Sequence, residues 1–276
     1  MSSKAQQKID LNDLDLNRSY TFEKFEYIND QLKYHTFEIN GQPVNLFEHD
    51  KNGNLIPMPQ ATINMEAVVS EIVRQLGNWN VQTGQGGAVT SSQGGFNFHV
   101  GGRRTIRAPD ASFISKNVYR HLTQQQLWTF KGEPFTPMVV IEVSDTIKDS
   151  DTNKKKKVFD DLDEKFKFEY FAMGTSVQMG LLIDPKNERM WIYKRNEKGK
   201  VFRREHTWGD IDGEDILPGF TLDVEMIKDI ISQKSRPTET SKKSESLNCP
   251  KCNNHFTDYH SFMKHFEKSH IREQKG

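Results

Sequence analysis

The sequence predicts a mixed α/β (α+β) domain, followed by a flexible linker and a small metal-folded module. Apolar residues recur at three- and four-residue spacing in two segments, which indicates amphipathic helices, and other segments have strand character. The expected helices lie at 63–79 and 158–170, and the expected strands at 107–115, 138–144, 179–183 and 190–193. Near the end of the chain, Cys249 and Cys252 are followed by several histidines, a pattern typical of metal sites.

Length and composition limit the possible classes of protein. The chain has 276 residues, enough for one domain of roughly 200 residues and a small module. No apolar run approaches the ~18 residues that a membrane span needs. The first residues contain no apolar signal segment, so we expect a nuclear address, with the cytoplasm as the alternative.

The net charge of zero is unevenly distributed. From Ser232 onward there are nine Lys and Arg against five Asp and Glu, a surplus of four, which leaves the rest of the chain at minus four. A protein that binds nucleic acid over its whole surface would be basic throughout. Any contact with a polyanion is therefore expected to be local, through the tail or through Lys154–Lys157.

The N-terminal part begins with an expected disordered leader at residues 1–19. A short helix is predicted at 21–28, with Thr21 as its cap, before short strands at 38–46 and 54–58. On the following helix, Glu71 stands near the apolar face. Either it is a solvated side chain on the helix flank or it points toward a metal site.

A glycine-rich stretch leads into the first acidic strand. Its glycines lack the G-K-[ST] ending of a phosphate-binding loop, so we read them as tight connections in a hairpin-rich sheet. In the predicted strand 107–115, alternation places Ala108, Asp110, Ser112 and Ile114 on one face. Asp110 would therefore emerge among largely buried neighbours.

The second acidic strand, 138–144, is the most strand-like run in the chain. It follows a short helix expected within 117–127, for which Thr123 is a plausible cap. Glu142 lies inside this apolar run, where an ionised carboxylate is costly unless it is paired. A metal ion or a neighbouring Lys or Arg would supply that partner.

Two lysines lie on the helix predicted at 158–170. Lys165 and Lys167 are two residues apart and so about 200° apart around the helix, which means that only one can face the two acidic strands. Two carboxylates and an ammonium can together hold a divalent metal and a water against a phosphodiester. The domain is expected to end before Ile231.

Seven short motifs then stand in a specific order. They are M-P at Met58, W-N-x-Q-T-G from Trp79, P-D-A-S-F-I from Pro109, V-V-I-E-V from Val139, L-D-E-K from Leu162, M-G-L-L-I-D-P from Met179 and L-P-G-F-T-L-D from Leu217. In this order the sequence resembles the bacterial family of restriction-endonuclease domains, a branch of the PD-(D/E)XK nuclease superfamily. The resemblance covers roughly residues 20–230, within a domain expected at 20–231.

This resemblance implies a restriction-endonuclease-like fold, with a mixed central sheet flanked by helices. It also implies that Asp110 and Glu142 are the carboxylates that hold magnesium, and that Lys165 is the catalytic lysine, with Lys167 as the runner-up. In the wider superfamily the lysine stands two residues after the second acid, where this chain has Ser144. The implied products are a 3′-hydroxyl and a 5′-phosphate.

The C-terminal segment carries a separate signal. Residues 232–248 have no apolar periodicity and are rich in Ser, Lys and Glu, so we expect a flexible linker. The pattern C-x2-C-x12-H-x4-H follows, with phenylalanines at two core positions. Two thiolates and two imidazoles at this spacing predict a tetrahedral zinc site. Its ligands would be Cys249, Cys252, His265 and His270.

The module at 249–276 resembles the ββα zinc fingers of eukaryotic transcription factors. Fewer than about 40 residues cannot bury a sufficient core, so zinc is expected to fold it. By helix position, Asp258, Ser261 and Lys264 would face the bases of DNA. His255 and His260 are out of ligand register and are expected on the surface. The finger could tether nucleic acid, contact a protein or be purely structural.

The leading hypothesis is a magnesium-dependent endodeoxyribonuclease that a zinc finger tethers to DNA. The main alternative is a catalytically inactive nuclease-fold protein that binds DNA or serves as an adaptor, an idea favoured by Ser144 and by the negative charge of the main domain. A weaker third reading is a nucleic-acid-processing component of a mobile element. Double-strand cutting with one active site per chain would favour a homodimer.

Overall fold

The computed structural model describes residues 11, 14–39, 41–146, 152–196, 198–232, 247–252, 254–256 and 259–271. The chain divides into two compact units, Met1–Ser232 and Gln233–Gly276. In the described part of the chain, no helix combines the length and the apolar character needed to cross a bilayer. Most of the predicted leader and linker lies outside the described residues. Leu247 and Asn248, expected in the linker, instead form a short strand.

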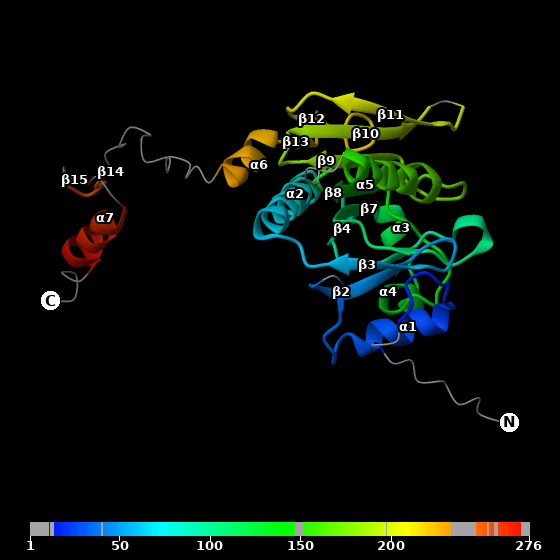
Figure 1. The fold of residues 1–276 in the computed structure, drawn as a ribbon. Coiled ribbons are helices and arrows are strands. Elements are labelled where there is room, and N and C mark those ends of the chain that lie inside the picture. Colours follow the sequence, from blue (N-terminus) through cyan, green and yellow to red (C-terminus); the bar gives the residue numbers. More distant parts are fainter. Residues whose placement is uncertain are drawn as a thin grey trace. The chain divides into compact units, whose positions relative to one another are not determined.

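A six-stranded mixed sheet forms the centre of the first unit (Figure 1). The strand order is β11-β10-β9-β8-β7-β4, in which β8 and β9 are parallel and the other neighbours are antiparallel. The strands are β4 (Ala88–Ser91), β7 (Ala111–Ile114), β8 (Val139–Val143), β9 (Met179–Asp184), β10 (Arg189–Arg195) and β11 (Val201–His206). The predicted mixed α+β class is confirmed.

Helical segments cover both faces of this sheet. On one face, α2 (Ile63–Gln82) and α6 (Val224–Ile231) enclose one apolar core with alternate residues of β7–β10. On the other face, α5 (Thr152–Lys165) continues into the π-helical turn η3 (Phe166–Tyr170), which packs on a second core. Because it is covered on both sides, every residue of β8 is buried. This explains why β8 reads as an almost continuous apolar run.

A second sheet lies beside the first and carries α1 (Phe22–Gln31) against β2 (Figure 1). The predicted cap is confirmed, because the Thr21 hydroxyl accepts a hydrogen bond from the Lys24 N–H. The strand order of this second sheet is β1-β2-β6-β5, with β3 also paired to β2. The strands are β1 (Glu38–Ile39), β2 (Gln42–His49), β3 (Leu55–Pro59), β5 (Phe96–Asn97) and β6 (Ile106–Arg107).

The predicted continuous strand at 107–115 is wrong. It is broken into β6, which ends at Arg107, and β7, which begins at Ala111, and the two belong to different sheets. Pro109 has no N–H to donate to a ladder, and the Ala108 N–H donates instead to a carboxylate oxygen of Glu48, at 2.8 Å. Asp110 therefore lies in the bend that precedes β7 rather than on a strand.

Several other elements differ from expectation. The helix predicted within 117–127 is two short helices, α3 (Lys116–Tyr119) and α4 (Gln124–Trp128). The predicted cap at Thr123 is confirmed, as part of a capping box with Gln126. Strand β11 was not predicted, because its exposed central residues show no apolar alternation. A small hairpin, β12 (Ile211–Asp212) and β13 (Thr221–Leu222), precedes α6.

The second unit contains a short hairpin followed by a helix. Strands β14 (Leu247–Asn248) and β15 (His255–Phe256) pair antiparallel. Helix α7 (Tyr259–Phe266) continues as the π-turn η4 (Glu267–Ile271). Phe256 and Phe262 meet edge to face, with their ring centroids 5.9 Å apart, as the two predicted core positions require.

One buried ion-pair network connects the second sheet to η3, which packs on the central sheet. The Arg107 guanidinium, at the end of β6, lies 2.7 Å from a carboxylate oxygen of Glu48 on β2 and 2.5 Å from one of Glu169 on η3. All three side chains are less than a tenth exposed. Removing one member would therefore leave uncompensated charge inside the protein.

We expect Arg107→Ala to lower the free energy of unfolding by about 3–5 kcal/mol, because buried Glu169 loses the cation it contacts and buried Glu48 loses one of its two. Urea denaturation followed by circular dichroism measures this change. As a matched control, Lys33→Ala removes an exposed ion pair with Asp30 and should cost less than about 1 kcal/mol. Equal effects of the two variants would show that the buried network contributes no more than a surface pair.

Candidate functional site

Asp110 and Glu142 come together at the junction of β7 and β8. Ala111, which follows Asp110, is paired with Ile141, which precedes Glu142. The Val143 N–H donates a hydrogen bond of 2.7 Å to Asp110 Oδ2 and so ties the bend to β8. The two predicted carboxylates are thus held on adjacent segments of the central sheet.

Glu142 points to the face of the sheet that η3 covers. Its Oε1 atom lies 2.9 Å from the Lys165 ammonium and accepts a short hydrogen bond from the Tyr170 hydroxyl. Burial, and after it the negative charge of Glu142, raises the pKa of Tyr170 well above its usual value. Tyr170 is therefore a hydrogen-bond donor to the carboxylate at neutral pH.

The π-helical turn explains how one short segment supplies several groups to this place. The Phe171 N–H donates to the Phe166 carbonyl five residues earlier, at 2.9 Å. With this wider turn, residues four and five positions after Lys165 face the same side. Lys165, Glu169 and Tyr170 consequently all contact the buried charged group.

Glu48 of the second sheet completes the surroundings of Lys165. Its Oε1 atom is 3.2 Å from the Lys165 ammonium, and its other oxygen holds Arg107. Burial by itself would lower the pKa of Lys165, but the charges of Glu142 and Glu48 outweigh it and raise that pKa. Burial would likewise raise the pKa of Glu48, but Lys165 and Arg107 lower it.

Lys167 contacts a different carboxylate from those that Lys165 contacts. Its ammonium is 2.6 Å from a carboxylate oxygen of Asp163, one turn back on α5. The same carboxylate also binds Arg203 and Tyr193. Of the two lysines weighed from the sequence, the structure brings Lys165 to Glu142. The position two residues after Glu142 is Ser144, whose N–H donates to the Ile183 carbonyl at 2.9 Å.

Glu71 matches neither alternative taken from the sequence. It is buried rather than solvated, and its carboxylate accepts hydrogen bonds from Arg74 and Gln75 on its own helix, at 2.6–2.9 Å. Helix α2 packs on the face of the sheet opposite to η3. The structure therefore does not bring Glu71 to Glu142.

Carboxylates outnumber cations in this group. Among the described side chains, Glu48, Asp110, Glu142 and Glu169 lie with Arg107 and Lys165, so four negative groups meet two positive ones there when all are ionised. Burial, followed by the charge of Glu142, raises the pKa of Asp110 to about 7. Such a deficit of positive charge beside two carboxylates suits a hard divalent cation, which takes oxygen ligands. The chemistry of the residues present therefore fits a hard divalent cation such as magnesium.

Glu48, Arg107, Glu169 and Tyr170 were not identified from the sequence as members of the site. One weaker signal could have revealed Glu48, because it directly follows the apolar pair Leu46 and Phe47 in β2. No comparable signal exists for Glu169 and Tyr170, since an ordinary helix would turn at least one of them away from Lys165.

The second unit gathers four metal-ligand side chains. One ligand atom from each of Cys249, Cys252, His265 and His270 lies within 4.8 Å of the others. Cys252 Sγ is 3.2 Å from His265 Nε2. Among the described residues, the buried Nε2 atom of His270 has no hydrogen-bond partner. A buried imidazole nitrogen of this kind fits metal ligation, and two thiolates with two imidazoles suit zinc.

Of the other finger residues, Ser261 and Lys264 are exposed on α7, whereas Asp258 and the side chain of His260 lie outside the described residues. His255 is exposed, as expected, and its Nδ1 atom contacts the Asn248 amide oxygen.

In metal-free protein, we expect Asp110→Asn to raise stability at pH 8 by about 2–4 kcal/mol. The pKa of Asp110 is raised on folding, so its favourable contribution is complete below pH 4 and disappears as the pH rises to about 7. The gain should therefore nearly vanish at pH 4. Urea denaturation at several pH values measures it, with the exposed Asp30→Asn as control. A gain independent of pH would contradict the assignment.

Comparison with known proteins identifies a family to which the chain is similar. The family model Uma2, described as "Putative restriction endonuclease", matches residues 33–225, more than two thirds of the chain. No curated protein matches the chain significantly. The matched region contains the whole group from Glu48 to Tyr170. The chain therefore belongs to the Uma2 restriction-endonuclease family.

Proposed function

We propose that the first unit is a metal-dependent endodeoxyribonuclease whose active site consists of Asp110, Glu142 and Lys165. The observation that carries this proposal is the 2.9 Å contact between the Lys165 ammonium and the Glu142 carboxylate, beside Asp110, in a member of a nuclease-like family. Two carboxylates and a lysine can together hold a divalent cation and a water against a phosphodiester.

Asp110 and Glu142 would hold Mg²⁺. When bound, the ion would neutralise charge on the scissile phosphate and make a water more acidic. Tyr170 donates its hydroxyl hydrogen to Glu142, and the Val143 N–H donates to Asp110. These hydrogen bonds keep both carboxylates in place.

Lys165 would act as a cation rather than as a base. Its raised pKa keeps the ammonium protonated at neutral pH, so it has no free electron pair to accept a proton. From its position between Glu142 and Glu48 it can donate a hydrogen bond to a water or to the oxygen on which negative charge develops. The products would be a 3′-hydroxyl and a 5′-phosphate.

A second candidate is a nuclease fold that binds DNA without cutting it. The favouring observation is that the Lys165 ammonium is already bound by two carboxylates and is only 13% exposed. A lysine engaged in this way must exchange a partner before it can approach a phosphate. Ser144, at the usual lysine position, agrees with this alternative.

We further propose that the second unit is a zinc finger that tethers the nuclease to nucleic acid, with the exposed Lys264 as one contact. Its short hairpin, its helix and its four clustered ligands support this role. A protein contact is the alternative. The resemblance to eukaryotic fingers favours a nuclear location over a cytoplasmic one.

The nuclease proposal predicts that the full-length protein nicks supercoiled plasmid DNA in the presence of Mg²⁺. Asp110→Ala, Glu142→Ala and Lys165→Met should each lower the nicking rate by about 100-fold or more, because each removes charge stabilisation at the phosphate. Gel electrophoresis of the plasmid over time measures the rate.

Lys167→Met is the matched control, since Lys167 is a helical lysine two residues away that pairs with Asp163. It should retain the wild-type nicking rate. Absence of nicking by the folded wild-type protein with any divalent metal would reject the enzyme and favour the binding-only alternative. Equal losses in Lys165→Met and Lys167→Met would reject the assigned lysine.

The zinc proposal predicts one zinc ion per chain in the purified full-length protein. Cys252→Ser and His270→Ala should lose that zinc, because three ligands hold a structural ion far less tightly than four. Elemental analysis after gel filtration measures the content. His255→Ala, which changes a histidine of the same hairpin outside the ligand set, should keep its zinc. Loss of zinc from His255→Ala alone would contradict the assignment.

A further inference from the structure

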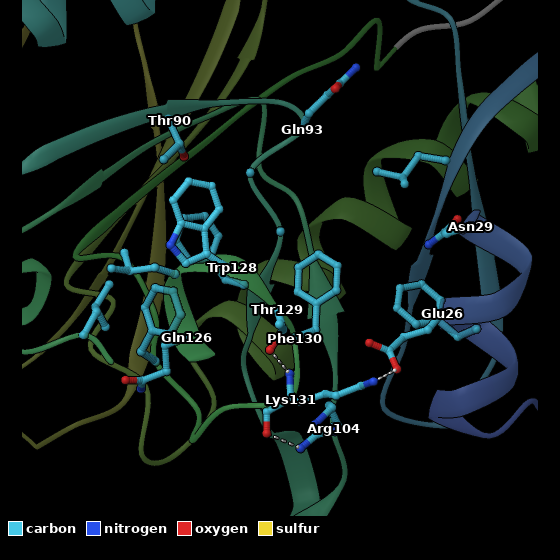
Figure 2. A pocket seen from close by; sticks show the side chains of 18 of the residues that line it. Glu26, Asn29, Thr90, Gln93, Arg104, Gln126, Trp128, Thr129, Phe130 and Lys131 are labelled. Carbon is cyan, nitrogen blue, oxygen red and sulfur yellow. Dashed lines mark hydrogen bonds and ion pairs between the residues drawn. The ribbon is translucent and has the colours of Figure 1, made fainter. Parts of the chain in front are cut away.

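A pocket of about 1030 Å³ lies in the first unit, outside the charged group described above. It opens between α1, the connection from β4 to β5, and the segment from α4 to Phe135. Figure 2 shows Thr90 and Trp128 on one side and Glu26 and Asn29 of α1 on the other. A volume of this size exceeds what a few ordered waters fill and is in the range of ligand sites.

The pocket shares a face of the central sheet with Glu142. Thr90 pairs with Ser112, and Ser112 pairs with Val140, two residues before Glu142. Paired residues point to the same face, and residues two apart on a strand do so as well. The Thr90 and Ser112 hydroxyls are in fact hydrogen-bonded, at 2.7 Å.

The pocket is also near the charged group along the sheet. Ser91, next to Thr90, is paired with Ala111, the residue that follows Asp110. Paired Cα atoms of antiparallel strands are about 5 Å apart. Successive nucleotides of a stacked strand advance by about 3.4 Å. A nucleic-acid strand at Asp110 would therefore bring a nucleotide to the pocket within a few steps.

The charges that line the pocket balance. Three acidic and three basic residues sum to zero, and two of the pairs are ion pairs: Lys131 with Glu26 at 3.4 Å and Lys33 with Asp30 at 3.0 Å. The Arg104 guanidinium lies 4.3 Å from the centre of the Phe22 ring. A path for phosphates would need a surplus of positive charge, so the balanced lining suits a neutral group.

Aromatic side chains supply most of the apolar wall. Trp128 is 80% exposed, although its indole N–H is held by the Gln124 side chain at 3.0 Å. Phe130 and Phe135 line the same pocket. An exposed but fixed indole offers a flat face on which a base can stack, and such stacking does not depend on sequence.

We propose that this pocket receives an unstacked base of the nucleic-acid substrate while the neighbouring phosphate lies at Asp110 and Glu142. The inference rests on the proposed nuclease function for the position of that phosphate. A base is neutral, aromatic and rich in hydrogen-bonding groups, in agreement with the balanced charges, the indole face and the polar Thr90 and Gln93. The preferred substrates are thus single strands or duplexes with unpaired nucleotides.

Binding of a fluorescently labelled, single-stranded oligodeoxynucleotide of mixed sequence by the full-length protein tests this proposal. In buffer without added divalent cation, Trp128→Ala should weaken binding about tenfold by fluorescence anisotropy, and Trp128→Phe should restore most of the affinity. Tyr34→Ala is the matched control, because Tyr34 is also an exposed aromatic residue but does not line the pocket. It should bind like the wild type.

A second measurement compares nicking of a duplex that has one unpaired base with nicking of the fully paired duplex. The wild type should prefer the unpaired substrate, and Trp128→Ala should lose that preference. Strand binding that persists in excess deoxyadenosine monophosphate would support recognition of a base within a strand. Full displacement by this free nucleotide would overturn the proposal.

The two proposals fail in different ways. Wild-type affinity of Trp128→Ala for single strands, in a protein that still nicks plasmid, would overturn the pocket assignment alone and favour another occupant such as a peptide strand. Weakened binding by Trp128→Ala, in a wild-type protein that never nicks DNA, would support the base pocket and reject the nuclease.

Discussion

The buried carboxylate of Glu48 is the point on which the charged centre of this protein depends. It accepts hydrogen bonds from the Ala108 N–H, from Arg107 and from Lys165, and thereby joins β2, the bend before β7 and the end of α5. A carboxylate removed from water is stable only with such partners. The need to satisfy it holds the second sheet, the central sheet and the π-turn in one arrangement.

That arrangement concentrates charge that the fold by itself would not need. Four carboxylates and two cations occupy one largely buried place, and the pKa of Asp110 is raised to about 7 as a result. Hydrophobic residues of similar size would pack there at a lower free-energy cost. Clusters of this kind with perturbed pKa values are typical of functional sites, where the chemistry explains the lost stability.

Two different environments meet on the same face of the central sheet. Around Glu142 the lining is ionic and deficient in positive charge, whereas the pocket at Trp128 is aromatic and balanced in charge. A nucleic acid has the same division, with phosphates that need cations and bases that need flat apolar surfaces. The second unit has a centre of its own, formed by two phenylalanines and four side chains that could hold a metal ion.

Local sequence patterns by themselves determined several helices and strands and some of the candidate site residues. Apolar periodicity predicted α2 and β8, and the cost of burying a charge in a strand selected Glu142. Cysteine and histidine spacing selected the four clustered ligands in the same way. These features follow from residues close together in the chain, where spacing and solvation alone decide the outcome.

Only the tertiary structure decided which buried charged side chains contact one another. Glu48 and Lys165 are 117 residues apart, and no periodicity connects them. The choice of Lys165 over Lys167 depends on which side of α5 faces the sheet, and the positions of Glu169 and Tyr170 depend on a π-turn. The break at Pro109 likewise became visible only once the Ala108 N–H had found Glu48. Long-range pairing of buried charges is a property of the folded chain, because burial itself creates the need for those partners.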